Sequence, residues 1–188
     1  MPDVTAVVPS IPPRAWMLRR ALASVLGQSH PVDAISVAID TTHAGSAATR
    51  NRALYAATTE WCCFIDDDDQ WKPNHVERLL ATAEETSADV VYPWPEMVGG
   101  GDPRPDRFGV PFDEAELRRG SYIPVTSLVR TKLAQDCGGF HLRPGSPYDD
   151  HAFYLSCLEA GGKFVHLPER TWLWNIHSGN TSGEPTRW

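Results

Sequence analysis

The first half of the chain alternates between short apolar runs and helical patterns, and this alternation limits the fold more than any other feature. Strand-like runs cover residues 4–8, 34–39, 61–65 and 89–92, and helical patterns cover residues 15–26, 44–57 and 73–83. Apolar strands that alternate with helices of about a dozen residues are typical of a parallel sheet covered on both faces. The sequence therefore predicts a doubly wound α/β fold.

The second half is less regular. Residues 93–120 are rich in Gly, Pro and charged side chains, so a mobile loop is expected at about 94–120, with a short helix at 113–118. Further on, the patterns predict strands at 123–129 and 171–176 and helices at 131–136 and 148–159. A chain of 188 residues fits one domain with a sizeable core.

Composition excludes some classes of protein. With 24 acidic and 17 basic residues the net charge is −7, which argues against a non-specific polyanion binder. The four cysteines lack metal-ligand spacing, which favours reduced thiols in a cytoplasmic protein. No apolar run approaches the roughly 20 residues that span a bilayer, so no membrane segment is expected.

Four consecutive aspartates, Asp66 to Asp69, follow the predicted strand at 61–65. Ligands of such sheets collect beyond the carboxyl ends of the strands, so residues 9–14, 40–45 and 66–69 should share one crevice. Asp66 and Asp68 fall on one side of an extended segment, and their like charges need a positive partner. Hard oxygen ligands at this place predict Mg²⁺ or Mn²⁺ bound together with the phosphates of a nucleotide or diphosphate ligand.

The acidic run has two other interpretations. A solvated acidic turn, or a cap for the next helix, requires no ligand at all. A calcium loop of the EF-hand type would place acidic or amide side chains at suitable positions. It fails because Trp71 stands where the loop needs glycine, and Pro73 adds a second obstacle.

Several stretches spread over most of the chain resemble the family 2 glycosyltransferases. They are VTAVVPSIPPR, GSAATRNRALYAAT, FIDDDDQWKP, PYDDHAFYLSCLEAGG and WLWNIHSGNTS. The resemblance implies the GT-A fold, a mixed and mostly parallel sheet flanked by helices in a single domain. It also implies a nucleotide-binding half at residues 1–92 and an acceptor and catalytic half at residues 93–188.

The same resemblance assigns the donor site. It places Pro9, Ser10, Ile11 and Arg14 at the base and ribose, although many members have Tyr where Ile11 stands. Asp40 would bond the base, and Arg50 and Asn51 would face the nucleotide. Of the four aspartates, Asp66 is expected at the ribose, Asp67 at the nucleotide and Asp68 at the metal, while Asp69 only shapes the turn. His177 would complete the metal site.

In the acidic pair Asp149 and Asp150, the resemblance makes Asp150 the general base. A plain alternative is that the pair caps a helix, since acidic side chains stabilise helix N-termini without any chemistry. The implied reaction is metal-dependent, inverting transfer of a sugar from a nucleoside-diphosphate sugar, with a UDP-sugar as the expected donor and Mn²⁺ or Mg²⁺ as cofactor. The acceptor stays open among a glycan, a small molecule, a protein and a modified DNA base.

Two rival functions remain at this stage. A sugar nucleotidyltransferase shares the parallel sheet and acidic metal ligands, but it would want a Gly-rich, Lys-bearing loop after the first strand, and PSIPPR has neither. A non-catalytic module that binds nucleotide or glycan is the second, since seven tryptophans could stack on sugars.

Overall fold

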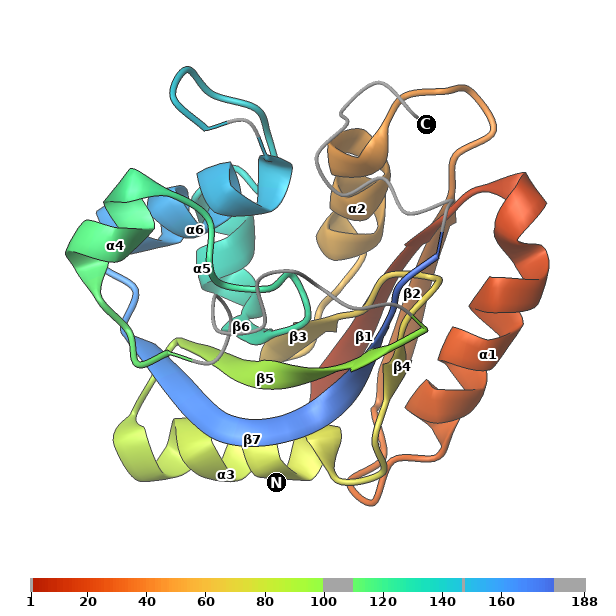
Figure 1. Cartoon of the computed structure of the whole chain (residues 1–188), viewed down its shortest axis with the longest axis horizontal. Helices are drawn as coiled ribbons and strands as arrows, with labels where there is room; N and C mark the ends of the chain where they lie inside the picture. The colour runs from red at the N-terminus through yellow and green to blue at the C-terminus, as the bar shows by residue number, and fades with distance from the viewer. Residues whose placement is uncertain (1, 100–109, 147, 178–188) are drawn as a thin grey trace.

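The structure, a computed structural model, describes residues 2–99, 110–146 and 148–177. Its centre is a seven-stranded sheet in the order β2-β1-β3-β6-β5-β7-β4 (Figure 1). The strands are β1 (Val4–Ser10), β2 (Ala34–Ile39), β3 (Trp61–Phe64), β4 (Gln70–Trp71), β5 (Val90–Val98), β6 (Leu128–Arg130) and β7 (Phe164–Asn175). The pairings orient β1, β2, β3, β5 and β7 one way and β4 and β6 the other. The predicted mixed sheet is confirmed.

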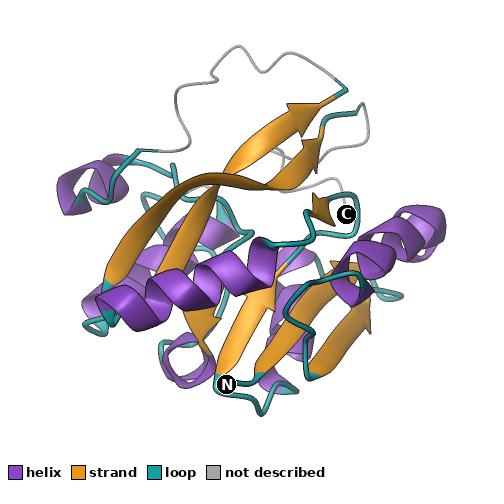
Figure 2. Ribbon diagram, turned by 90° about the horizontal axis from the view of Figure 1, so that it is seen from below, coloured by secondary structure: helices purple, strands orange, loops and turns teal. Residues whose placement is uncertain are grey.

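Helices cover both faces of this sheet (Figure 2). The helices α1 (Ala15–Leu26) and α3 (His75–Thr86) pack on one face. The other face carries α2 (Ser46–Tyr55), α4 (Glu114–Arg119), α5 (Thr131–Asp136) and α6 (Asp149–Glu159). A single 3₁₀ turn, η1 (Pro12–Arg14), links β1 to α1. This three-layer arrangement is the doubly wound architecture that the alternating sequence predicts.

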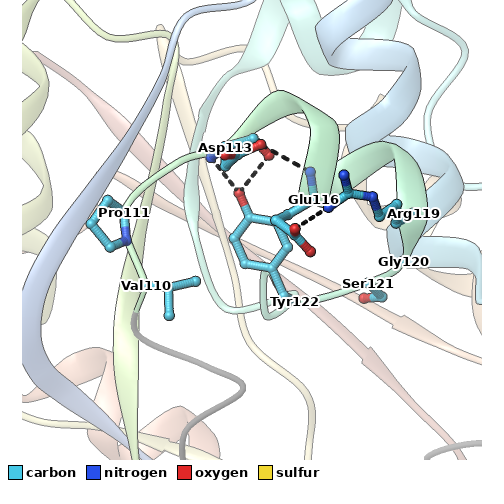
Figure 3. A pocket seen from close by; sticks show the side chains of 8 residues that line it. All are labelled: Val110, Pro111, Asp113, Glu116, Arg119, Gly120, Ser121 and Tyr122. Atoms are coloured by element: carbon cyan, nitrogen blue, oxygen red, sulfur yellow. Dashed lines mark hydrogen bonds and ion pairs between the residues drawn. The ribbon is translucent and has the colours of Figure 1, made fainter.

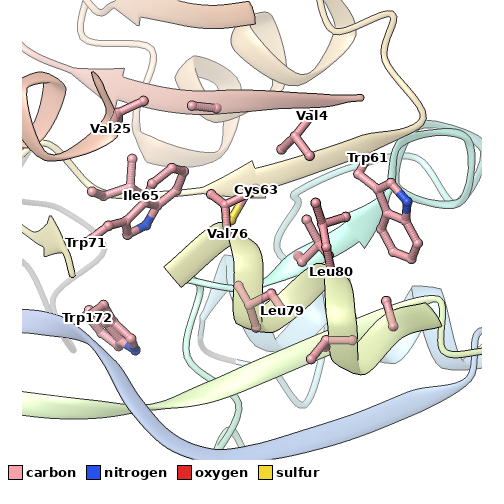
Figure 4. Close-up of a cluster of buried hydrophobic side chains, with 14 of the residues drawn as sticks. Val4, Val25, Trp61, Cys63, Ile65, Trp71, Val76, Leu79, Leu80 and Trp172 are labelled. Atoms are coloured by element: carbon pink, nitrogen blue, oxygen red, sulfur yellow. The ribbon is translucent and has the colours of Figure 1, made fainter. Parts of the chain in front are cut away.

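The period of two along each strand divides the core into two clusters. On β3, Cys63 faces the α1 and α3 side, whereas Cys62 and Phe64 face the α2 and α6 side. Figure 4 shows the first cluster, where α3 lays Val76, Leu79 and Leu80 against the sheet. Because both faces are covered, β1 and β3 are buried along their whole length and mostly apolar rather than alternating.

Several elements match the sequence prediction. The helix at 15–26, the strand at 34–39 and the helix at 131–136 have the expected bounds. The helix expected at 44–57 begins at Ser46 instead, since the N–H groups of Ala44 and Gly45 bond the Asp40 carboxylate. Gly45 has a φ of 91°, a left-handed conformation that favours glycine.

The prediction was wrong about the segment after residue 93. Strand β5 continues to Val98, so the expected loop at 94–120 begins later. Pro93 and Pro95 favour a loop by residue type, yet both lie at shifts in the β5–β7 register, where a ladder N–H group is not needed. Residues 100–109 of the expected loop lie outside the described residues, and the short helix appears as α4.

Two more strands differ from expectation. Only the end of the strand predicted at 123–129 forms β6. Before it, the Pro124 carbonyl accepts a hydrogen bond from the Tyr154 hydroxyl rather than from a neighbouring strand. Strand β7 begins at Phe164, well before the predicted residue 171. Within the described parts of the chain, no helix is long and apolar enough to cross a membrane.

Candidate active site

The acidic run lies in the turn that follows β3. Strands β1, β2 and β3 are parallel, so their carboxyl ends meet at one edge of the sheet, as predicted. The Asp69 N–H donates to the Asp66 carbonyl at 3.1 Å, which closes a tight turn. Helix α3 begins later, with Asn74 as its N-cap residue, so none of the four aspartates caps it.

Three of the four carboxylates gather at one point. One oxygen from each of Asp66, Asp68 and Asp69 lies within 4.8 Å of the other two. Burial, followed by the charge of Asp66, raises the pKa of Asp68 to about 6. Burial and the neighbouring carboxylates raise the pKa of Asp69 as well. Burial and repulsion between neighbouring carboxylates therefore both disfavour the charged form of these two groups.

Asp67 has a different set of partners from the three clustered carboxylates. Its side chain is 1% exposed, and it accepts hydrogen bonds from Ser10 Oγ at 2.7 Å and Arg14 Nη1 at 3.1 Å. Ser10 is the last residue of β1 and Arg14 is the last of η1, so this contact ties the first strand end to the third. Burial is the main reason that the pKa of Asp67 is raised.

The end of β7 closes the other side of the turn. The Asn175 N–H donates to Asp69 Oδ1 at 3.0 Å, and Asn175 Nδ2 donates to the Asp68 carbonyl at 2.8 Å. His177 Nε2 lies 3.3 Å from Asp68 Oδ2, so the structure brings these two predicted metal ligands together. Sequence reasoning missed the part played by Asp69, because its partner Asn175 is 106 residues away.

This donor set suits a divalent metal ion. Carboxylate oxygens are the ligands that Mg²⁺ and Mn²⁺ prefer, and an imidazole is acceptable to Mn²⁺. Asp68 is central because it lies among Asp66, Asp69 and His177. Burial and the charge of Asp66 raise the pKa of Asp68, and a bound cation would offset that repulsion. The residues present therefore fit the metal that the sequence predicted.

Arg50 joins the acidic turn to the acidic pair on α6. Its guanidinium donates to Asp66 Oδ1 at 2.7 Å and to Asp149 Oδ2 at 3.0 Å, while it packs 4.8 Å from the Phe140 ring centroid. The arginine side chain is only 5% exposed. Arg50 was expected to face the nucleotide; in the structure it connects two acidic groups that are more than 80 residues apart in sequence.

Asp149 and Asp150 occupy the first turn of α6. Asp149 accepts from Ser46 Oγ at 2.8 Å and from Arg50, so its charge is compensated. Asp150 accepts from the His151 N–H at 2.6 Å. Burial, followed by the charge of Asp149, raises the pKa of Asp150 to about 7, which suits a group that takes up a proton near neutral pH.

His151 fixes the position of this helix start. Its Nε2 lies 2.7 Å from the Leu117 carbonyl on α4, and its Nδ1 lies 2.9 Å from Ser146 Oγ. The side chain is buried. Hydrogen bonds to Leu117 and Ser146 therefore hold the backbone next to Asp150.

Two residues that were predicted to contact the nucleotide have partners within the protein. The Asp40 carboxylate accepts from the N–H groups of Thr42, Ala44 and Gly45 at 2.9–3.1 Å, and these bonds lower its pKa. Both polar atoms of the Asn51 side chain bond the Phe140 backbone at 2.7 Å. Asn51 thus holds a distant loop in place, and its expected position facing the nucleotide stays a prediction.

The remaining predicted donor residues belong to the end of β1. Pro9 is buried within the strand, and Ile11 is partly exposed at the start of η1. The Ser10 hydroxyl is directed to Asp67, as described above. The predicted residues of the β1 and β3 ends are therefore brought together, whereas Asp40 serves the loop that follows β2.

A separate pocket of about 510 Å³ lies beside α4 (Figure 3). Within it the Tyr122 hydroxyl bonds the Asp113 backbone, and Arg119 pairs with Glu116. The lining residues are Val110, Pro111, Asp113, Glu116, Arg119, Gly120, Ser121 and Tyr122. Helix α4 contacts His151 through Leu117, so the pocket lies on the side of the molecule that carries Asp150.

Comparison with known proteins agrees with this geometry. One similar solved structure is S. aureus TarS 1–349 in complex with UDP-GlcNAc, with a TM-score of 0.76 and 17% identity over 95% of this chain. Another is the mannosyltransferase PcManGT from Pyrobaculum calidifontis in complex with GDP-Man and Mn²⁺, with a TM-score of 0.66 and 16% identity over 95% of this chain. The chain spans 60% of the length of each of them. At these identities the likeness establishes the fold.

Comparison with curated protein sequences found no match. The sequence profile of glycosyl transferase family 2 matches residues 34–141, which is more than half of the chain and includes the acidic turn. The chain therefore belongs to glycosyl transferase family 2.

Proposed function

We propose that this chain is a metal-dependent glycosyltransferase that moves a sugar from a nucleoside-diphosphate sugar, first of all a UDP-sugar, to an acceptor hydroxyl. Family membership supports this, as do fold neighbours that bind UDP-GlcNAc or GDP-Man with Mn²⁺. The observation that carries the proposal is the Asp66–Arg50–Asp149 bridge. It joins the turn that we propose to bind the metal to Asp149, the neighbour of the candidate base Asp150.

The acidic turn is the proposed donor side. Asp68 and His177 would hold Mn²⁺ or Mg²⁺, with Asp66 and Asp69 adding negative charge around the ion. A metal held there would supply positive charge to stabilise the departing diphosphate. Asp66, whose side chain is 31% exposed, is the carboxylate that we assign to the ribose.

The other donor contacts surround this turn. We place Pro9, Ser10, Ile11 and Arg14 around the nucleotide, with Asp67 fixing Ser10 and Arg14. Asp40 contributes by holding the loop at 40–45 in shape. Arg50 contributes by orienting Asp66.

Asp150 is the proposed general base. The acceptor oxygen attacks the anomeric carbon, the bond from that carbon to the diphosphate oxygen breaks, and Asp150 receives the hydroxyl proton. A single displacement of this kind inverts the anomeric configuration. The pKa of about 7 supports the role, because a base works best when its pKa is close to the working pH.

The two rival functions predict different outcomes. A sugar nucleotidyltransferase would form a nucleotide sugar from a nucleoside triphosphate, and the family match gives it no support. A non-catalytic module would bind nucleotide without turnover. The cytoplasmic location expected from the cysteines stays a prediction; all four cysteines are free thiols.

The test is nucleotide release from a panel of UDP-, GDP- and TDP-sugars, with Mn²⁺ or with EDTA. We expect release from at least one donor that depends on Mn²⁺ and increases when the correct acceptor is added. Metal-dependent binding without release for every donor would support the binding module. Neither release nor binding would contradict the proposed function.

A further inference from the structure

Arg14 lies between two of the four aspartates. Its Nη1 atom is 3.1 Å from Asp67 Oδ1 and 3.2 Å from Asp68 Oδ2, and its side chain is 11% exposed. Its backbone is fixed in η1, where the Arg14 N–H bonds the Ile11 carbonyl at 3.0 Å. The guanidinium therefore contacts both a carboxylate of the candidate metal cluster and one outside it.

The contact with Asp68 conflicts with metal binding. Asp68 Oδ2 is the atom that meets both Arg14 Nη1 and His177 Nε2. A divalent ion bound to this oxygen would lie at about 2.1 Å from it, so two positive charges would meet at one atom. Because like charges repel strongly in a partly buried site, Arg14 has to move away from Asp68 when the ion binds.

Asp67 offers Arg14 a second carboxylate partner. This carboxylate is absent from the three-carboxylate cluster, and Ser10 Oγ holds its second oxygen at 2.7 Å. Arg14 can leave Asp68 and keep a buried charged partner. Its positive charge then stays at the edge of the metal site, where the oxygens of a diphosphate need neutralising.

We propose that Arg14 occupies the cation position at Asp68 in the metal-free protein and, on donor binding, shifts onto Asp67 and binds the diphosphate. The assignment rests on the proposed function. It moves Arg14 from the base and ribose, where the sequence resemblance placed it, to the diphosphate end of the donor. It also gives Asp67 a role distinct from that of the other three aspartates.

The proposal predicts opposite effects on two ligands. Without nucleotide, Arg14→Gln removes a competitor, so Mn²⁺ should bind about tenfold more tightly. With saturating Mn²⁺, the same variant should bind UDP about tenfold more weakly, because a charge-assisted contact to phosphate is lost. Uridine, which has no phosphate, should bind as it does to the wild type.

Mn²⁺ affinity is measured from the free-ion electron paramagnetic resonance signal at pH 8, and UDP and uridine affinities are measured by calorimetry. Arg14→Lys keeps the competing charge and should leave Mn²⁺ affinity within about twofold of wild type. Asp67→Asn leaves Arg14 with Asp68 and should weaken Mn²⁺ binding. Arg19→Gln removes an equal charge from an exposed position on α1 and serves as the control.

Unchanged or weaker Mn²⁺ binding by Arg14→Gln would overturn the proposal, and so would an equal loss of UDP and uridine affinity, which would place Arg14 at the nucleoside. In both cases the wild type still binds Mn²⁺ and UDP, so the proposed function survives. If the wild type binds neither Mn²⁺ nor UDP, the metal site itself is wrong and this assignment falls with it.

Discussion

Negative charge is compensated to different degrees in two acidic regions. One is the acidic turn after β3, and the other is the acidic pair at the start of α6. In the turn, three carboxylates lie within 4.8 Å of one another, and the arginines reach only part of the cluster. On α6, Arg50 compensates Asp149 and leaves Asp150 as a single carboxyl with a pKa raised to about 7. Clustered carboxylates favour a cation, whereas a single, partly buried carboxyl such as Asp150 favours a proton. This difference separates a candidate metal site from a candidate base.

The largest expected effect is that of removing the base. Asp150→Asn should lower kcat by about 10²- to 10⁴-fold, since general-base assistance typically contributes that much. Affinity for UDP with Mn²⁺ should stay within about twofold of wild type, because the turn is untouched. Steady-state kinetics and calorimetry check the two halves of this prediction. An unchanged kcat would remove Asp150 from the role.

Arg50 belongs to both regions, so its loss should damage both. Arg50→Gln leaves Asp66 and Asp149 without their shared partner, and we expect the free energy of unfolding to fall by about 3 kcal/mol. Arg50→Lys keeps the charge but cannot reach both carboxylates with two N–H groups, so it should recover only part of the loss.

Chemical denaturation measures both Arg50 variants. Asp136→Asn breaks only the exposed pair with Lys132 and is the matched control, with an expected change below about 0.5 kcal/mol. Equal stability of Arg50→Gln and this control would show that the two acidic regions are not coupled through Arg50.

The pH dependence should follow Asp150. A base must be ionised, so kcat/KM should fall about tenfold per pH unit below the pKa of about 7 and level off above it. The contribution of Asp150 to folding stability has the opposite pH dependence. The folded-state pKa is raised above the ordinary value of 3.8, so the protonated carboxyl is favoured on folding and stability is lost as pH rises towards 7.

Asp150→Asn should therefore remove part of that loss of stability between pH 4 and 7, as measured by denaturation at several pH values. A stability difference between variant and wild type that does not change with pH would contradict the shifted pKa.

Much of the fold follows from local pattern, and the exceptions come from long-range contacts. The helix at 15–26 and the strand at 34–39 were predicted with the observed bounds because periodicity and length determine them. The continuation of β5 through Pro93 and Pro95 was not predictable, since it depends on where the register with β7 shifts. The division of the single domain into a nucleotide-binding half and an acceptor and catalytic half stays a prediction.

The candidate site divides in the same way. Runs of aspartate after a strand indicate a cation site from sequence alone. Which aspartates join the cluster depends on partners far along the chain: Ser10 turns Asp67 away, and Asn175 brings Asp69 in. Arg50 is recognisable as a charged residue on a helix, but its double contact needs the packing of α2 against α6.

The smallest expected effect concerns the turn alone. Asn175→Ala removes one hydrogen bond to the Asp68 carbonyl, and the backbone bond from residue 175 to Asp69 remains. We expect the free energy of unfolding to fall by about 1 kcal/mol and Mn²⁺ affinity to fall a few-fold, with little change in the ionisation of Asp150. A shift in the pH profile of kcat/KM for this variant would mean that the two regions are less separate than their contacts indicate.

The central claim is that Asp68 serves the metal and Asp150 serves the proton. Calorimetric binding of UDP to wild type, Asp68→Asn and Asp150→Asn, each with Mn²⁺ and with EDTA, tests it most directly. We predict that Asp150→Asn keeps Mn²⁺-dependent binding within about twofold of wild type, whereas Asp68→Asn loses at least about tenfold and no longer responds to EDTA. Full Mn²⁺-dependent binding by Asp68→Asn, or its loss in Asp150→Asn, would contradict the assignment.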